Sequence, residues 1–116
     1  MINLKTFLII ISLIFATHTA QAEINYNFKD VEHKADKECI AIMSIMRDSL
    51  VQMGADGTHP LYVEITDWQN QLILKYAYSK QLNTHVETWK MLLTQRLYEG
   101  KWTPTETELI DCIDRI

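Results

Sequence analysis

Cys39 and Cys112 have the most distinctive chemistry of any side chains in this sequence. A redox-active pair typically occurs as Cys-x-x-Cys, and a zinc site needs three or four ligands at recognisable spacings; the sequence contains neither pattern. An even pair of cysteines in a small exported chain usually forms a disulfide. We therefore predict a structural disulfide between Cys39 and Cys112, which would contribute a large share of the stability of so small a core.

The remaining polar side chains form no recognisable catalytic set. His33, His59 and His85 do not have the His-x-x-x-His spacing of a metal site, and the sequence contains neither a Gly-rich phosphate loop nor Gly-x-Ser-x-Gly. Ser44 and Ser49 lie in a stretch predicted to be helical, where a hydroxyl usually bonds to the backbone. The sequence therefore predicts a binding protein and not an enzyme, with no metal and no cofactor.

Residues 1–22 have the pattern of a secretory signal peptide. Lys5 precedes an apolar run from Phe7 to Ala16, and Ala20-Gln21-Ala22 supplies the small side chains that signal peptidase reads. The apolar run is about half of the roughly 20 residues that a membrane-spanning helix needs. We expect cleavage after about Ala22, a single mature domain over residues 23–116 without a membrane anchor, and a periplasmic location.

The charge of the chain argues against nucleic acid as a partner. The sequence has 11 basic and 15 acidic residues, a net charge of −4, and removal of Lys5 with the signal peptide makes it about −5. An acidic domain repels phosphate backbones, and no basic stripe offsets this charge.

Apolar side chains recur at three- and four-residue steps, and most of the Gly and Pro residues fall between these stretches, which is typical of an all-α domain. The first predicted helix runs from about Asp30 to Met53. Its expected core positions are Ala35, Cys39, Ile42, Met43, Met46, Leu50 and Met53. The second runs from about Leu61 to Lys80, with Leu61, Ile65, Trp68, Leu72 and Tyr76 on one face. An alternative interpretation makes residues 61–65 a short strand and starts the helix at a Thr66-x-x-Gln69 capping box.

Two further capping boxes predict the later helices. Thr84-x-x-Glu87 opens a third helix that ends at Gly100, and Thr103-Pro104-Thr105-Glu106 opens a fourth with Thr103 as the N-cap. Their expected core positions are Val86, Trp89, Leu93, Leu97, Leu109, Cys112, Ile113 and Ile116. Short connections make consecutive helices antiparallel, so we predict a compact bundle of about four helices in which the disulfide joins the first helix to the last.

Two connections are the candidate partner-binding surfaces. The first is the loop from Gly54 to Pro60, and the second is the turn around Gly100. Their candidate contact residues are Asp56, Thr58, His59, Tyr98, Glu99, Lys101 and Trp102. Exposed Tyr and Trp on a rigid turn are typical interface anchors, and replacing Glu99 and Lys101 by Ala should weaken binding while leaving the melting temperature nearly unchanged. The alternatives are that the loop is only a spacer and that the two aromatic residues fold inward over the end of the bundle.

Several segments together resemble one known family. They are Cys39-Ile40-Ala41, Tyr76-Ala77-Tyr78, Leu82-Asn83, Val86-Glu87-Thr88-Trp89, Leu93 through Tyr98, and Leu109-Ile110-Asp111-Cys112-Ile113-Asp114. The pattern is similar to the type VI secretion amidase immunity family, in which an aromatic-rich helix precedes a short turn and a Glu-containing helix. A Cys-Ile-Asp or Cys-Leu-Asp segment closes the domain in that family. The resemblance covers roughly residues 37–114.

The resemblance implies a periplasmic antitoxin without catalysis of its own. Members of this family are exported helical proteins with a disulfide, and they are often homodimers. They protect a bacterium from peptidoglycan amidases by placing a protruding loop in the active-site cleft of the amidase. The partner implied for this chain is therefore a cognate peptidoglycan amidase effector.

Two other classes of helical binding protein remain open. Secretin pilotins are small helical bundles with one early and one late cysteine, and Thr103-Pro104 ahead of Cys112 fits that pattern. Pilotins are normally lipoproteins, whereas this signal peptide has no lipobox. A small periplasmic chaperone is the other alternative, although the mature sequence has no histidine cluster to sense acid.

Overall fold

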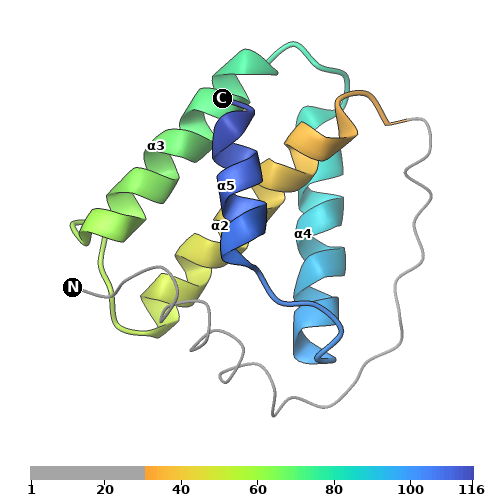
Figure 1. Cartoon of the computed structure of the whole chain (residues 1–116). Coiled ribbons are helices and arrows are strands. Elements are labelled where there is room, and N and C mark those ends of the chain that lie inside the picture. The colour runs from red at the N-terminus through yellow and green to blue at the C-terminus, as the bar shows by residue number, and fades with distance from the viewer. Residues whose placement is uncertain (1–30) are drawn as a thin grey trace.

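The computed structural model describes residues 31–116, and the predicted signal peptide lies outside the described residues. These residues form α2 (Lys34–Gln52), α3 (Pro60–Lys75), α4 (Leu82–Tyr98) and α5 (Glu106–Asp114), and they contain no strand (Figure 1). The predicted all-α bundle of about four helices is confirmed. The alternative strand over residues 61–65 is wrong, because this segment is the beginning of α3.

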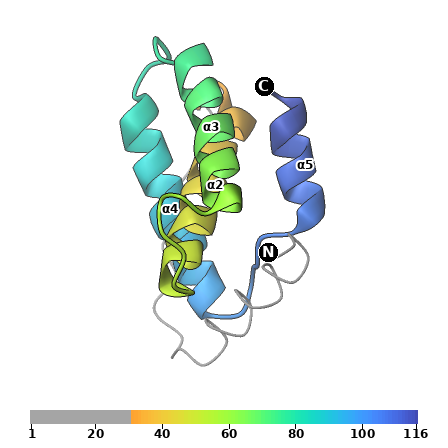
Figure 2. The ribbon, with the colours of Figure 1, turned by 90° about the vertical axis from the view of Figure 1, so that its left-hand side faces the viewer.

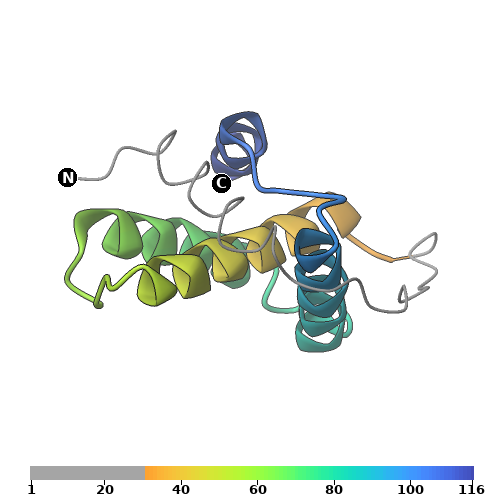
Figure 3. The ribbon, with the colours of Figure 1, turned by 90° about the horizontal axis from the view of Figure 1, so that it is seen from below.

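Helix α2 is the central element of the bundle. It packs against each of the other three helices, and Figures 2 and 3 show α4 and α5 on opposite sides of it. Consecutive helices run in roughly opposite directions, as short connections require (Figure 1). A helix with neighbours on several sides has to bury more than one face.

The core is built mainly from α2. Its buried apolar residues are Cys39, Ile40, Ala41, Ile42, Met43, Ile45, Met46 and Leu50. The predicted stripe at Cys39, Ile42, Met43, Met46 and Leu50 is confirmed, but Ile40, Ala41 and Ile45 extend burial around the helix. Ala35 is exposed, so its assignment to the core is wrong; the buried residues in the first turn of α2 are Asp36 and Lys37.

The predicted disulfide is present and joins α2 to α5. The Cα atoms of Cys39 and Cys112 lie 5.5 Å apart, the two residues are 73 positions apart in the chain, and both are buried. Leu109 is the other buried apolar residue of α5. Ile116, predicted to lie in the core, is instead exposed past the end of α5. The disulfide therefore holds a helix that has little buried apolar surface of its own.

The boundaries of α3 and α4 differ from those predicted. His59 is the N-cap of α3, where its Nδ1 accepts a hydrogen bond from the Leu61 backbone N–H at 3.2 Å. Helix α3 ends at Lys75 and not at Lys80, and residues 76–81 form a turn. The N-cap of α4 is Gln81, which has φ of 56° and makes no side-chain capping bond. The predicted capping box at Thr84 is therefore wrong. Thr84 lies in the first turn of α4 instead.

The start of α5 is displaced by two residues. Its N-cap is Thr105, whose hydroxyl accepts from the Glu108 backbone N–H at 3.1 Å and donates to the Glu108 carboxylate at 3.2 Å. Thr105 and Glu108 therefore form the N-terminal cap of α5, and the prediction that Thr103 is the N-cap is wrong. The predicted end of α4 is confirmed: Gly100 has φ of 71°, a left-handed conformation that suits glycine at a helix C-terminus.

Candidate functional site

The α4–α5 turn folds its aromatic side chains inward. Tyr98 and Trp102 are partly buried and pack against the core. The indole Nε1 of Trp102 donates to the Glu108 carboxylate at 3.2 Å. The inward-folded alternative is the arrangement that the structure shows, and it closes the end of the bundle around the start of α5.

Glu99 is also buried in this turn. Its side chain is only 2% exposed, with Oε1 accepting from Gln95 Nε2 at 3.3 Å and Oε2 lying 3.2 Å from Lys101 Nζ. The Lys101 side chain is 55% exposed. Of these two charged residues, Lys101 is the one that a partner could contact directly, and the expectation that Glu99 can be replaced without structural effect does not fit its burial.

The loop between α2 and α3 is ordered by its own hydrogen bonds. The Asp56 carboxylate accepts from the backbone N–H of Thr58 at 2.8 Å and from its hydroxyl at 2.5 Å. These bonds stabilise the charged form and hold the pKa of Asp56 below its usual value. Asp56 and Thr58 are exposed, whereas His59 is partly buried at the N-terminus of α3. The loop therefore presents two polar side chains in a fixed arrangement.

The two predicted surfaces do not combine into one site. Figures 1 and 3 show the loop between α2 and α3 and the α4–α5 turn on different sides of the molecule. A partner with a narrow cleft would engage one of them at a time.

A third cluster, formed by Lys37, Lys80 and His85, lies at the other end of α4 and was not predicted from the sequence. Lys37 is fully buried in the first turn of α2. Its Nζ donates to the carbonyl oxygen of Lys80 at 3.0 Å and lies 3.0 Å from Nδ1 of His85. A surface pocket of about 400 Å³, lined by Glu32, Lys80, Gln81 and His85, opens beside it.

The electrostatics of this cluster follow from burial. Loss of solvation lowers the pKa of Lys37, and the nearby Glu32 carboxylate acts in the opposite direction. Burial also lowers the pKa of His85, and the charge of Lys37 lowers it further. A neutral His85 can accept a hydrogen bond from the Lys37 ammonium group. The only sequence signal for this cluster is that Lys37 shares a helix face with Ile40 and Ala41.

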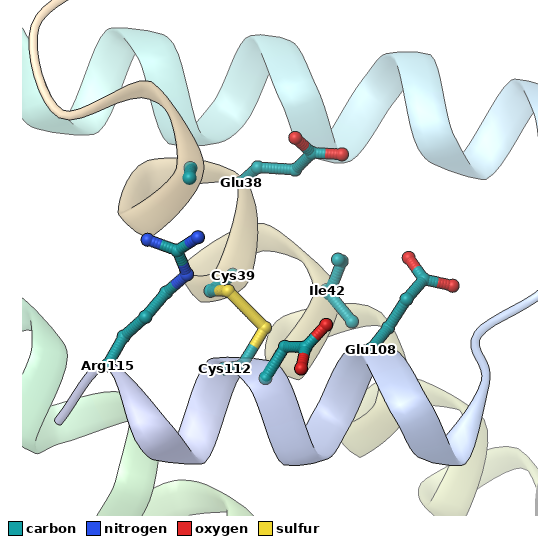
Figure 4. Close-up of a pocket in the computed structure, with 8 residues that line it drawn as sticks. Glu38, Cys39, Ile42, Glu108, Cys112 and Arg115 are labelled. Carbon is teal, nitrogen blue, oxygen red and sulfur yellow. A yellow bond between two sulfur atoms is a disulfide. The ribbon is translucent and has the colours of Figure 1, made fainter.

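A smaller pocket, of about 160 Å³, opens beside the disulfide (Figure 4). Three of the residues that line it are acidic, namely Glu38, Glu108 and Asp111. Burial raises the pKa of Glu38, and Glu108 raises it further. Arg115 lines the same pocket and lies 3.7 Å from Asp36. Within residues 31–116, no group of His, Cys, Asp and Glu side chains is placed to hold a metal ion.

Comparison of the chain with protein-family models, curated proteins and solved structures finds no match. Among the helices between residues 31 and 116, none combines the length and the apolar character needed to cross a bilayer.

Proposed function

We propose that this chain is a periplasmic immunity protein that binds and inhibits a type VI secreted peptidoglycan amidase. The observation that best supports the proposal is the disulfide between Cys39 on α2 and Cys112 on α5. These are the two cysteines on which the family resemblance is most distinctive. A disulfide between the first and last described helices fits an exported domain that has to keep its shape with a small core.

Inhibition would occur by occlusion of the active-site cleft of the amidase. An occluding surface has to be convex and already ordered, so that little conformational entropy is lost on binding. Both candidate connections of this bundle meet that requirement. Hydrogen bonds to Asp56 order the loop between α2 and α3, and Gly100 in a left-handed conformation ends α4 at the turn between α4 and α5. Asp56, Thr58 and Lys101 are the exposed polar residues on these two connections.

The test is an inhibition assay with purified mature protein. Peptidoglycan hydrolysis by amidases from the same organism should stop when one molar equivalent of this protein is added, and the protein alone should hydrolyse nothing. Lys101→Ala and Asp56→Ala compare the two connections. If no amidase is inhibited while the protein binds a secretin subunit, the pilotin alternative replaces the immunity function.

A further inference from the structure

The turn between α3 and α4 exposes large apolar side chains that the core does not use. Tyr78 is fully exposed in this turn, which comprises residues 76–81, and Leu74 in the last turn of α3 is 75% exposed. Folded domains expose many single apolar side chains, but Tyr78 and Leu74 lie four positions apart in the chain and are the two most exposed large apolar side chains of the described residues.

The same segment is the basic part of an acidic chain. Residues 68–86 contain no Asp or Glu, whereas the whole chain has a net charge of −4. Lys75 and Lys80 lie on either side of Tyr78 in this segment. Glu32 is the acidic residue that lines the adjoining pocket, and its carboxylate lies 3.1 Å from Nε2 of His33. Asp36 is bonded to the Tyr76 side chain and lies 3.7 Å from Arg115. The segment itself therefore carries a positive charge, opposite in sign to that of the chain as a whole, and its exposed Lys80 complements a negatively charged partner.

The backbone on both sides of Tyr78 is held in place. Before it, Tyr76 is partly buried and its ring centroid lies 4.6 Å from that of His33. After it, the buried Lys37 donates to the carbonyl oxygen of Lys80, and the backbone N–H of Ser79 donates to the carbonyl oxygen of Tyr76 at 2.9 Å. Tyr78 is thus an exposed side chain on an ordered backbone, which keeps the entropy cost of binding low.

We propose that Leu74, Tyr78 and the flanking lysines form a docking surface for an acidic patch on a partner protein, with Tyr78 as the central contact. This inference rests on the proposed function, in which that partner is the amidase, and it adds a surface that neither of the two predicted connections includes. Tyrosine is enriched among the residues that dominate binding energy, and lysines at the edge of an interface mainly accelerate association.

The test is to measure binding of the cognate amidase to Tyr78→Ala and Lys80→Glu. Tyr78→Ala should raise the dissociation constant by at least about tenfold, because the complex dissociates faster. Lys80→Glu should slow association and reduce its dependence on salt, because it reverses a charge at the edge of the interface. Both variants should fold as the parent does, since the Tyr78 side chain is fully exposed and Lys80 makes its contact with Lys37 through its backbone.

Met91→Ala is the matched control, because Met91 is an exposed apolar residue in the middle of α4. It should bind like the parent. If the parent inhibits the amidase and both turn variants bind with unchanged affinity, the docking surface is wrong while the proposed function stands. If the parent inhibits no amidase, both proposals fail. If the parent binds anionic phosphatidylglycerol vesicles and Tyr78→Ala does not, the surface binds lipid and the proposed protein docking is wrong. If the parent self-associates and Tyr78→Ala does not, the surface binds a second copy of this chain, and the proposal is again wrong.

Discussion

The Nζ atom of Lys37 lies 3.0 Å from Nδ1 of His85, and the same nitrogen donates to the carbonyl oxygen of Lys80. This contact joins the start of α2 to the start of α4 and to the turn before it. A doubly protonated His85 has no lone pair left to accept the bond, and it would place a second positive charge beside the buried ammonium group. The contact therefore requires a neutral imidazole.

The first prediction is that acid destabilises the protein through His85. Its pKa is lowered from 6.5 in the folded state, mainly by burial, so the unfolded state binds the proton more readily. The free energy of unfolding should fall as the pH drops below about 6.5 and through the folded-state pKa, by at most about 1.4 kcal/mol per pH unit. Chemical denaturation at a series of pH values between 8 and 5 measures this, and His85→Gln should show a shallower dependence. Equal slopes for parent and variant would remove His85 as the group responsible.

The second prediction concerns the disulfide. Cys39→Ser combined with Cys112→Ser releases a loop of 73 residues in the unfolded state, which should cost roughly 4 kcal/mol of stability in the chain-entropy model. Loss of α5 from the bundle should precede loss of the other helices, because α5 buries little besides Leu109 and Cys112. Denaturant titration gives the energy, and amide hydrogen exchange gives the order of opening. A variant that melts within a degree or two of the parent would contradict the prediction.

A third prediction corrects the expectation that Glu99 is replaceable. Its side chain is buried and accepts from Gln95 Nε2, so Glu99→Ala should destabilise the protein by roughly 1–3 kcal/mol. Lys101→Ala is the comparison in the same ion pair, and it should cost less than Glu99→Ala because it leaves the carboxylate and its hydrogen bond from Gln95 in place. Thermal unfolding of the two variants decides the point: equal effects would show that burial of the carboxylate does not matter.

The fourth prediction uses two threonines with the same local motif. Thr105→Ala should lower stability by about 1 kcal/mol, because it removes the hydrogen bond to the Glu108 backbone N–H. Thr84 also precedes a Glu by three residues, but it lies inside the first turn of α4 and is exposed. Thr84→Ala should therefore leave the melting temperature nearly unchanged or raise it, since alanine is the better helix former. A larger loss at Thr84 would mean that it, and not Gln81, caps α4.

The sequence by itself predicted the kind of structure. Helical spacing of apolar residues identified all four helices, because a 3.6-residue repeat is a property of the chain and needs no knowledge of its neighbours. The end of α4 at Gly100 and the pairing of Cys39 with Cys112 were also predicted. Glycine adopts the left-handed conformation of a helix end without strain, and two cysteines allow a single intramolecular pairing.

The exact starts of the helices depended on tertiary structure. Thr103 and Thr105 are each followed three residues later by a glutamate, so local chemistry favours both as N-caps of α5. Thr105 is the N-cap in the folded protein, where Pro104 is buried and the Trp102 indole donates a hydrogen bond to Glu108. At α4, the turn from α3 places Gln81 in a left-handed conformation and leaves the Thr84 box unused.

Two charged side chains are buried in places that the sequence pattern does not indicate. Lys37 is buried because Lys80 and His85, more than 40 residues away, supply its hydrogen-bond partners. Glu99 is enclosed by the end of the bundle, whereas Tyr78, which has a similar place between two helices, stays fully exposed. The sequence determined which helices form, since that depends on neighbours along the chain; the packing of α2 among three helices decided which polar groups lie inside, because burial depends on neighbours in space.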